Sequence, residues 1–487
     1  MSIEFADPVG THGLSAGTSQ RAAEPEADGA TYRRRIAAAL AAGRRFAGLS
    51  LAAGDAAVRA LLAAADGSTE LVSVGLGSGQ VPTIVDLVPA AGWDERELAD
   101  LHGIGFTGHH PLRPLLDHSD SERWTVPVHG GDAYQVAVGP IHAGVNESGH
   151  FRFHLVGDRI LQLDARLFYK RRGLEQAAQG CQLERGTPFA ARACGACAVT
   201  NSVAYAHAAE QLLGLAAPAE LARVRTVLLE LERLWSHLND VAAICAGVGL
   251  AAGNNRFAAF TDRARELNAA VSGHRFLFGT VRVGGSDLAL GRDHVRSVRA
   301  DLADLRTEVT RSWRELIFNA SFAERLTDVG VVTADQARTL GTVGPSARAA
   351  GLSEDVRAGS PALAYAGLEP VVPDRAAGDV QARFEQRALE LGQTFELLER
   401  LLDRPLTPTG AEPGLATHEI GVGRVESPRG ATSCVLERDG TRIARIRLRT
   451  GSYATWPSVA FAAAGNLLPD FPLINKSFEL CYACADR

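Results

Sequence analysis

Two Cys-x-x-Cys pairs are the residues of this chain best suited to chemistry. The first pair is Cys194 and Cys197, and the second is Cys481 and Cys484, which lies close to Arg487 at the end of the sequence. Two thiolates at this spacing hold one soft metal ion from the same side, so two pairs supply four sulfur ligands. Three interpretations are open: a structural zinc site, a thiol–disulfide redox pair, or a metal site where the start of a domain meets its end.

The distance between the pairs distinguishes these interpretations. The pairs of a zinc site usually lie within about 12–20 residues of each other, whereas Cys197 and Cys481 lie at opposite ends of a long segment. A redox site requires one pair, not two. A joint metal site accounts for both pairs, including the pair in a tail, where chains normally fray. It predicts four sulfur atoms about 4 Å apart, as metal–sulfur bonds of ~2.3 Å require.

Length and composition place these cysteines in a globular protein of two or three domains. The chain has 487 residues, of which 46% are hydrophobic and 22% are charged. A net charge of −6 and the lack of a long basic stripe exclude nucleic acid as the expected partner. The odd cysteine count and the lack of a secretory signal at Met1 predict a reducing compartment. The sequence has no run of 18 apolar residues, so no transmembrane helix is expected. If the protein works at a membrane, other subunits would hold it there.

The N-terminal quarter predicts a tail and a small domain. Residues 1–30 carry few large apolar groups and are expected to be disordered. Residues 31–125 are expected to form a small α+β domain, with a helical pattern over 33–65 followed by short strands. A short helix follows, for which Asp94 is the expected N-cap and Gly103 the expected end.

Residues 135–487 predict a second, mainly helical domain with small antiparallel sheets, which makes the whole chain α+β. Apolar residues at steps of three and four predict a helix of about 30 residues from Pro218 and another over 379–402. Asp439-Gly440 is typical of a β-hairpin turn. The tail after residue 475 has to dock back onto this domain if the cysteine pairs are to meet.

Several stretches resemble known families. Residues 95–113 resemble the 30 kDa family of NADH:quinone oxidoreductase (complex I). Residues 139–487 resemble the large subunit of membrane-associated, complex-I-related nickel–iron hydrogenases of the formate hydrogenlyase and hydrogenase-4 type, which fuse both parts in one chain. The stretches that carry the second resemblance are Gly139-Pro140-Ile141-His142, Glu147, Gly149–Phe153, the first cysteine pair, Glu230–His237, Gly273–Phe276, Ser427-Pro428-Arg429-Gly430 and the second cysteine pair.

The resemblance implies a role for each site residue. The four cysteines would hold nickel, with Cys197 and Cys484 bridging to an iron that bears carbon monoxide and cyanide. Arg429 would lie over the open metal position as a fixed cation. Glu147 would be the proton gate beside a nickel-bound thiolate, where we expect Cys484. Thr450 and Ser452 would supply hydroxyls that hydrogen-bond a cyanide. Arg172 and Glu175 would belong to the proton path or to the interface with a partner.

The implied activity is the reversible heterolytic cleavage or evolution of dihydrogen. The chain carries no iron–sulfur motif of its own, so electrons would pass to a separate iron–sulfur small subunit, expected to bind near residues 168–182. The resemblance further implies membrane-arm subunits as partners, a formate dehydrogenase in the same complex, and a peripheral position on the cytoplasmic side of the membrane.

The sequence departs from the family pattern at three places. Asn201 replaces a usual His, Ser148 a usual Pro, and Glu479-Leu480 a usual Asp-Pro. These changes leave the four cysteines intact but affect the groups around them. The alternatives are a nickel-free component of a quinone- or ferredoxin-linked oxidoreductase, similar to the 49 kDa subunit of complex I, and a non-catalytic scaffold of such a complex.

Overall fold

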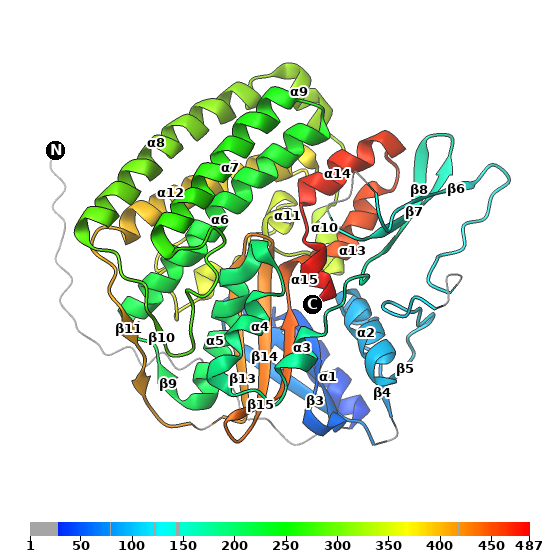
Figure 1. Cartoon of the computed structure of the whole chain (residues 1–487). Coiled ribbons are helices and arrows are strands. Elements are labelled where there is room, and N and C mark those ends of the chain that lie inside the picture. The colour runs from blue at the N-terminus through cyan, green and yellow to red at the C-terminus, as the bar shows by residue number, and fades with distance from the viewer. Residues whose placement is uncertain (1–27, 78, 120–122, 143–146, 417) are drawn as a thin grey trace.

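The computed structural model describes residues 28–77, 79–119, 123–142, 147–416 and 418–487 (Figure 1). The predicted disorder of residues 1–30 falls mostly outside this part of the chain. Its last three residues do not: Asp28 is the N-cap of the first helix, which begins at Gly29. An α+β architecture is confirmed, with a small N-terminal sheet, a helical layer and further small antiparallel sheets.

The N-terminal part is a three-stranded antiparallel sheet covered by helices. Its strands follow one another in the order β1-β2-β3, and α1 and α2 pack against them. Its core contains Tyr32, Ile36, Val58, Leu62 and Phe106. The elements are α1 (Gly29–Ala41), β1 (Arg45–Leu51), β2 (Ala57–Ala63), β3 (Thr69–Gly75), β4 (Gln80–Pro82), α2 (Gly92–His102) and β5 (Gly105–Thr107).

Two local predictions in this part are wrong. The helix expected over 33–65 ends at Ala41, and the rest of that segment is the hairpin β1–β2. Alanine-rich composition favours a helix, but backbone pairing with β3 and burial of both strands override this preference. Asp94 does not cap α2, because Ala91 occupies the N-cap position. Its carboxylate is instead buried against Arg447 and Arg449 of the last strand.

The N-terminal part also packs against the C-terminal sheet. Arg59 of β2 makes an ion pair with Glu437, at 2.6 Å. A small apolar cluster joins the two parts, formed by Ala47, Leu61 and Ala63 with Ile420, Val422 and Val435. The N-terminal part therefore has a core of its own and also packs against the C-terminal sheet. The domain boundary between residues 125 and 135 stays a prediction.

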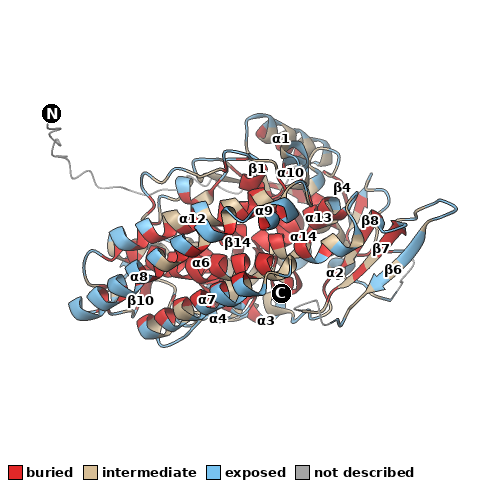
Figure 2. Ribbon diagram, turned by 90° about the horizontal axis from the view of Figure 1, so that it is seen from above, coloured by how far each residue is buried: buried red, intermediate tan, exposed pale blue. Residues whose placement is uncertain are grey.

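Long helices form the second layer. The predicted 30-residue helix is α6, which begins directly after Pro218 and is surrounded by α5, α7, α12 and α14. Figure 2 shows α6 as almost entirely buried, in contrast to the half-exposed α8. The helices of this layer are α5 (Ala198–Leu213), α6 (Ala219–Gly247), α7 (Ala251–Ser272), α8 (Arg292–Ile317), α9 (Ala320–Leu326), α10 (Ala334–Leu340), α11 (Gly344–Ala349) and α12 (Val380–Leu401).

A three-stranded antiparallel sheet lies beneath α5. Asp439-Gly440 forms the predicted turn between its second and third strands. The helix approaches the sheet closely because β13 carries glycines there: a Cβ at Gly423 would lie 1.9 Å from the carbonyl oxygen of Ala204. The strands are β13 (Ile420–Ser427), β14 (Gly430–Asp439) and β15 (Arg442–Arg449).

The C-terminal segment returns to the middle of the molecule, where Figure 1 shows the end of the chain beside β15 and α3. Its helices are α13 (Gly451–Ala463), α14 (Phe471–Phe478) and α15 (Tyr482–Asp486). Aromatic contacts fix it to a projecting hairpin, since Phe151 lies against Trp456, Phe471 and Tyr482. That hairpin, β7 (His150–Val156) and β8 (Arg159–Arg166), forms a three-stranded sheet with β6 (Tyr134–Val138). After β8 the chain forms the short helices α3 (Leu174–Ala178) and α4 (Thr187–Ala191).

No helix in the described ranges is both long enough and apolar enough to cross a lipid bilayer.

We predict that the N-cap of α12 contributes measurably to the stability of the protein. This helix also carries several side chains of the candidate metal centre. Asp379 is buried and accepts hydrogen bonds from the backbone N–H groups of Ala382 and Asp328, at 2.8 and 2.9 Å. Asp379→Ala should lower the free energy of unfolding by about 1–2 kcal/mol. Asp379→Asn keeps an oxygen for Ala382 but not for Asp328, so its thermal unfolding midpoint should lie between those of Asp379→Ala and the unchanged protein. Equal midpoints for all three proteins would contradict the prediction.

Candidate metal centre

The two cysteine pairs meet in the interior of the protein. Their four Sγ atoms lie within 4.8 Å of one another. Cys194, Cys197 and Cys484 are buried, and Cys481 is partly exposed. Cys197 directly precedes α5 and Cys481 directly precedes α15. The N-terminal end of a helix favours negative charge, so this placement stabilises thiolates.

Hydrogen bonding among the sulfur atoms makes the four thiols unequal. Hydrogen bonds from Cys194, Cys197 and Cys484 hold the pKa of Cys481 well below its ordinary value, and the charge of Arg429 lowers it further. The pKa of Cys484 is raised well above its ordinary value by its hydrogen bonds to the other three thiols.

A buried carboxylate holds the start of α5 and with it the first pair. Glu232 of α6 accepts hydrogen bonds from the backbone N–H of Val199, at 2.6 Å, and from both the N–H and the hydroxyl of Thr200, at 3.1 and 2.6 Å. Burial raises the pKa of Glu232 to about 7, while the hydrogen bonds from α5 work in the opposite direction. These bonds satisfy N–H groups that the first turn of a helix leaves without partners.

Arg172 ties the two pairs together. Its guanidinium donates to the carbonyl oxygens of Arg192 and Ala193, at 2.6 and 2.7 Å, just before Cys194. It also donates, at 3.5 Å, to the carbonyl oxygen of Ala483, which lies inside the second pair. The resemblance singled out Arg172 for a proton path or an interface, and the structure gives it this bridging contact.

The loop before α13 holds the second pair. The Thr450 hydroxyl donates to the carbonyl oxygen of Cys484, at 3.1 Å, and accepts from the N–H of Tyr453. The Ser452 hydroxyl oxygen accepts from the N–H of Cys481, at 3.1 Å. In the described part of the chain the hydroxyl hydrogen of Ser452 has no acceptor, whereas that of Thr450 is already engaged. Of the two hydroxyls expected to bind a cyanide, that of Ser452 is therefore the one whose hydrogen remains available to donate.

Arg429 is fixed beside the cysteines by a two-pronged ion pair. Its two terminal nitrogens donate to the two oxygens of Asp240, at 2.6 and 2.7 Å, and its backbone N–H donates to the Ser427 hydroxyl. Burial disfavours the charge, but Asp240 and then the charge on Cys481 raise the pKa of Arg429 above its ordinary value. The guanidinium is therefore a permanent cation next to the sulfur cluster. Its Nε has no partner among the described residues.

Sequence reasoning missed Asp240, although that residue orders this side of the site. It also accepts from Arg387 of α12, at 3.1 Å, and lies 3.5 Å from the Nδ1 of His237. His237 bonds through Nε2 to Glu390, at 2.9 Å, whereas its buried Nδ1 has no hydrogen-bond partner among the described residues. Asp240 lies on α6 directly beyond the stretch that carried the resemblance, and a carboxylate one turn after His237 was the available signal.

Glu147 reaches the second pair from the loop before β7. Burial and the negative charge of Cys481 raise its pKa, and a hydrogen bond from the backbone N–H of Ala483 opposes that rise. Gly149 allows this approach, because a Cβ there would lie 2.6 Å from the ring of Tyr482. The loop thus lies directly on the tail helix. Residues 143–146, which precede Glu147 in the matched stretch, lie outside the described residues.

Asn201 follows Cys197 by about one helical turn and therefore lies on the same side of α5. It is fully buried, and neither its Oδ1 nor its Nδ2 has a hydrogen-bond partner in the described ranges. A buried amide without partners is costly unless a group occupies the adjoining space. This orphaned amide is one observation that a further group fits at the cluster.

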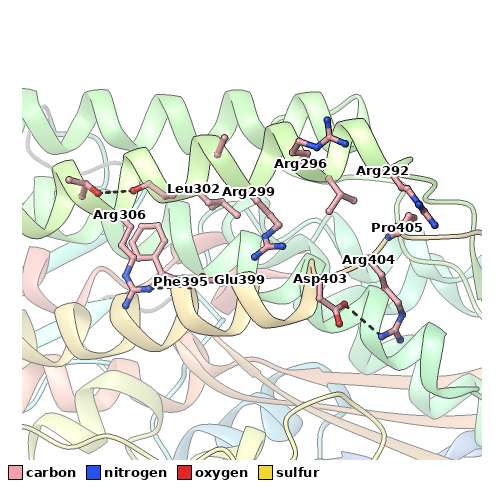
Figure 3. A pocket seen from close by; sticks show the side chains of 14 residues that line it. Arg292, Arg296, Arg299, Leu302, Arg306, Phe395, Glu399, Asp403, Arg404 and Pro405 are labelled. Atoms are coloured by element: carbon pink, nitrogen blue, oxygen red, sulfur yellow. Dashed lines mark hydrogen bonds and ion pairs between the residues drawn. The ribbon is translucent and has the colours of Figure 1, made fainter.

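The cysteine cluster is separate from the hollow part of the surface. An open groove of about 780 Å³ runs between α8 and α12. Figure 3 shows the side chains that line it, among them Arg292, Arg296 and Arg299 of α8 and Asp403 at the end of α12. No cysteine lines this groove.

The sequence matches two families in tandem. Residues 58–129 match the respiratory-chain NADH dehydrogenase 30 Kd subunit, and residues 252–418 and 414–487 match the 49 Kd subunit. Hydrogenase-4 component G of Escherichia coli (strain K12) is 30% identical over 84% of this chain and 76% of its own length. The chain belongs to the family of complex-I-related hydrogenase large subunits. It carries the 30 kDa-like part at its N-terminal end.

Other relatives show the breadth of this family. Formate hydrogenlyase subunit 5 of Escherichia coli (strain K12) is 29% identical over 86% of this chain and 79% of its own length. A solved chain of a membrane-bound sulfane sulfur reductase, an archaeal respiratory membrane complex, superposes with a TM-score of 0.68 at 25% identity. It covers 73% of this chain and 99% of its own. A component of the NADH-quinone oxidoreductase of Aquifex aeolicus (strain VF5) is also a relative, so the family includes proteins that are not named hydrogenases.

The residues present suit a thiolate-bound metal. Four sulfur donors from two Cys-x-x-Cys pairs form a soft ligand set, and their mutual distances allow all four to reach one ion. A permanent cation at Arg429, a hydroxyl donor at Ser452 and the orphaned amide of Asn201 surround the set.

We predict that the purified, metal-free chain binds about one equivalent of Co²⁺, an ion that favours tetrahedral thiolate ligands. Binding should produce intense sulfur-to-cobalt charge-transfer absorption. Cys481→Ser should greatly weaken it, because the pair that starts α15 loses a sulfur. Cys181→Ser is the matched control, since Cys181 lies outside the cluster and is not fully buried. The same loss in both variants would show that absorption arises elsewhere.

Proposed function

We propose that this chain is the catalytic large subunit of a nickel–iron hydrogenase. The observation that carries the proposal is the meeting of four sulfur atoms within 4.8 Å, next to a fixed guanidinium. Cys194, Cys197, Cys481 and Cys484 would hold the nickel–iron group. When bound, a nickel–iron group with carbon monoxide and cyanide ligands supplies the heterolytic cleavage or formation of dihydrogen.

The protein's own residues handle charge and protons around that group. Arg429 keeps a fixed positive charge at the cluster, because Asp240 and Arg387 hold it in one orientation. Ser452 supplies a hydroxyl donor next to Cys481. Glu147 lies against the N–H of Ala483, and a carboxyl with a raised pKa takes up and releases protons more readily near neutral pH. These three residues are the proposed machinery of the chain.

Electrons leave through a partner in this proposal. Between Cys194 and Cys197, Gly195 is exposed and Ala196 is partly exposed, so the cluster lies just beneath the surface. Lys170, Arg171 and Arg172 are exposed at the same edge, in the segment expected to bind an iron–sulfur small subunit. Membrane-arm subunits, a formate dehydrogenase and a peripheral position on the cytoplasmic side complete the proposed assembly. Subunits of membrane-bound complexes among the relatives support it.

The second candidate is a nickel-free component of a quinone- or sulfur-linked oxidoreductase. The match to the 49 Kd subunit and the similarity to a sulfane sulfur reductase favour it. Metal analysis of the native complex separates the two candidates: nickel in the complex supports the hydrogenase, whereas a complex without nickel supports the second candidate.

We predict that Glu147→Gln separates proton transfer from metal binding. Glutamine keeps the shape and can accept the hydrogen bond from Ala483, but it does not titrate near neutral pH. Nickel content should be unchanged, while dihydrogen–deuterium exchange falls by about 100-fold or more, the scale of a lost acid–base group. Cys481→Ser, measured in parallel, should lose nickel and activity together. Full exchange activity in Glu147→Gln would show that protons take another route, such as one through Glu175.

Arg429→Lys tests the fixed cation. Lysine keeps the charge but cannot donate to both oxygens of Asp240 in one plane, so its ammonium group has no fixed orientation. We expect nickel to be retained and turnover to fall by about tenfold or more, the scale of one misplaced electrostatic donor. Arg438→Lys is the control, because Arg438 lies near the end of β14 and pairs with the exposed Glu419. Equal turnover in both variants would contradict this role for Arg429.

A further inference from the structure

The second cysteine pair depends on a helix that is too short to hold itself. α15 has five residues, and isolated helices of this length are not stable in water. Its position is therefore set by contacts at its two ends. Ser452 and Trp456 bond to Cys481 at the start, and the residues after Cys484 supply the contacts at the other end.

Those last contacts reach the N-terminal part of the chain. The Arg487 side chain is buried and makes an ion pair with Glu97 of α2, and its Nε lies 3.4 Å from Glu175. The guanidinium also lies 4.7 Å from the ring centre of Tyr453. Of these three partners, Glu97 alone comes from the part of the chain matching the 30 kDa subunit.

Glu97 balances two buried cations at once. Its oxygens also accept from both terminal nitrogens of Arg447, at 2.9 and 3.0 Å. Asp94, the second acid of α2 at this place, bonds to Arg447 and Arg449 instead. Without the charge of Glu97, Glu175 would be the one carboxylate among the described residues near the buried guanidiniums of both Arg447 and Arg487. Removing one member of a buried ion pair is strongly destabilising.

We propose that Glu97 is a positioning residue for the metal centre, acting through Arg487 on the helix that carries Cys484. The N-terminal part is then a component of the wall that closes the cysteine cluster. If α2 does not supply the carboxylate of Glu97, the segment that carries Cys484 moves away from the other cysteines. The inference rests on the proposed metal centre but assigns a new role to a residue far from it in sequence.

The test measures release of Co²⁺ from the full-length chain into excess chelator, followed by the loss of thiolate–cobalt absorption. Glu97→Gln should release the ion about tenfold faster or more, the scale of one lost charge-assisted hydrogen bond. Glu95→Gln is the matched control on the same helix. Glu95 is equally buried, but its contacts with Thr83, Ile84 and His109 stay inside the N-terminal part. Release from Glu95→Gln should remain close to that of the unchanged protein.

Two further readouts exclude general loosening. Amide hydrogen exchange should rise in the peptide 480–487 of Glu97→Gln, with little change in the core strands β2 and β3. Arg487→Met should accelerate release as much as Glu97→Gln, and the double variant should be no faster than Arg487→Met alone, because the two side chains act through each other.

The outcomes that overturn the proposal are distinct. Equal release from Glu97→Gln and Glu95→Gln, or additive effects in the double variant, would overturn the positioning role alone. Failure of the unchanged protein to bind Co²⁺ at all would overturn the metal centre itself.

Discussion

The placement of the chain's last residues in the interior is the constraint on which the site depends. The buried Asp486 side chain accepts from the backbone N–H groups of Phe168 and Lys170, at 2.8 and 2.9 Å. The carbonyl oxygen of Arg487 accepts from the N–H groups of Arg172 and Gly173, at 3.0 and 3.1 Å. Half of the sulfur ligands lie within this segment. A tail that normally frays is thus held by bonds from segments far away in sequence, and the cluster exists only when those bonds form.

Arginine side chains accomplish most of this long-range fixation. Arg172 and Arg487 hold the tail, and Arg387 donates to the carbonyl oxygen of Phe478, at 3.2 Å, near the end of α14. Arg383 is buried without a carboxylate partner in the described part of the chain and donates to Ser477 and to two backbone carbonyl oxygens. A planar guanidinium with five donors satisfies several oxygens at once, which a lysine ammonium in the same place does not. Each such arginine joins elements that are far apart in the sequence.

The sequence allowed some of this to be predicted. The helices α6 and α12 followed from apolar periodicity, and the turn at Asp439-Gly440 followed from its residue types. The four cysteines were identified as one cluster because their spacing and the family resemblance agreed. The strands between residues 45 and 63 were missed, because alanine-rich segments favour helices and only pairing with β3 decides otherwise.

The contacts that position the cysteines could not be predicted. The ion pair of Glu97 with Arg487 and that of Asp240 with Arg429 join residues separated by most of the chain or by several helices. No local pattern encodes such pairs, since each carboxylate is compatible with many arginines until the fold selects one. Arg172 shows the intermediate case: resemblance identified the segment, but its donation to Ala193 and Ala483 became apparent only in three dimensions.

The surrounding charges alone do not distinguish a nickel protein from a nickel-free relative. Arg429, Asp240 and Arg387 are joined by hydrogen bonds that do not involve a metal. The thiols differ in this respect. A thiol is a weak hydrogen-bond donor and packs like a small apolar side chain, so four of them within 4.8 Å add little stability that alanine or valine would not. Their gathering is explained by an ion that takes all four as ligands. The thiols therefore carry the functional assignment, and the ionic frame explains how the fold keeps them together.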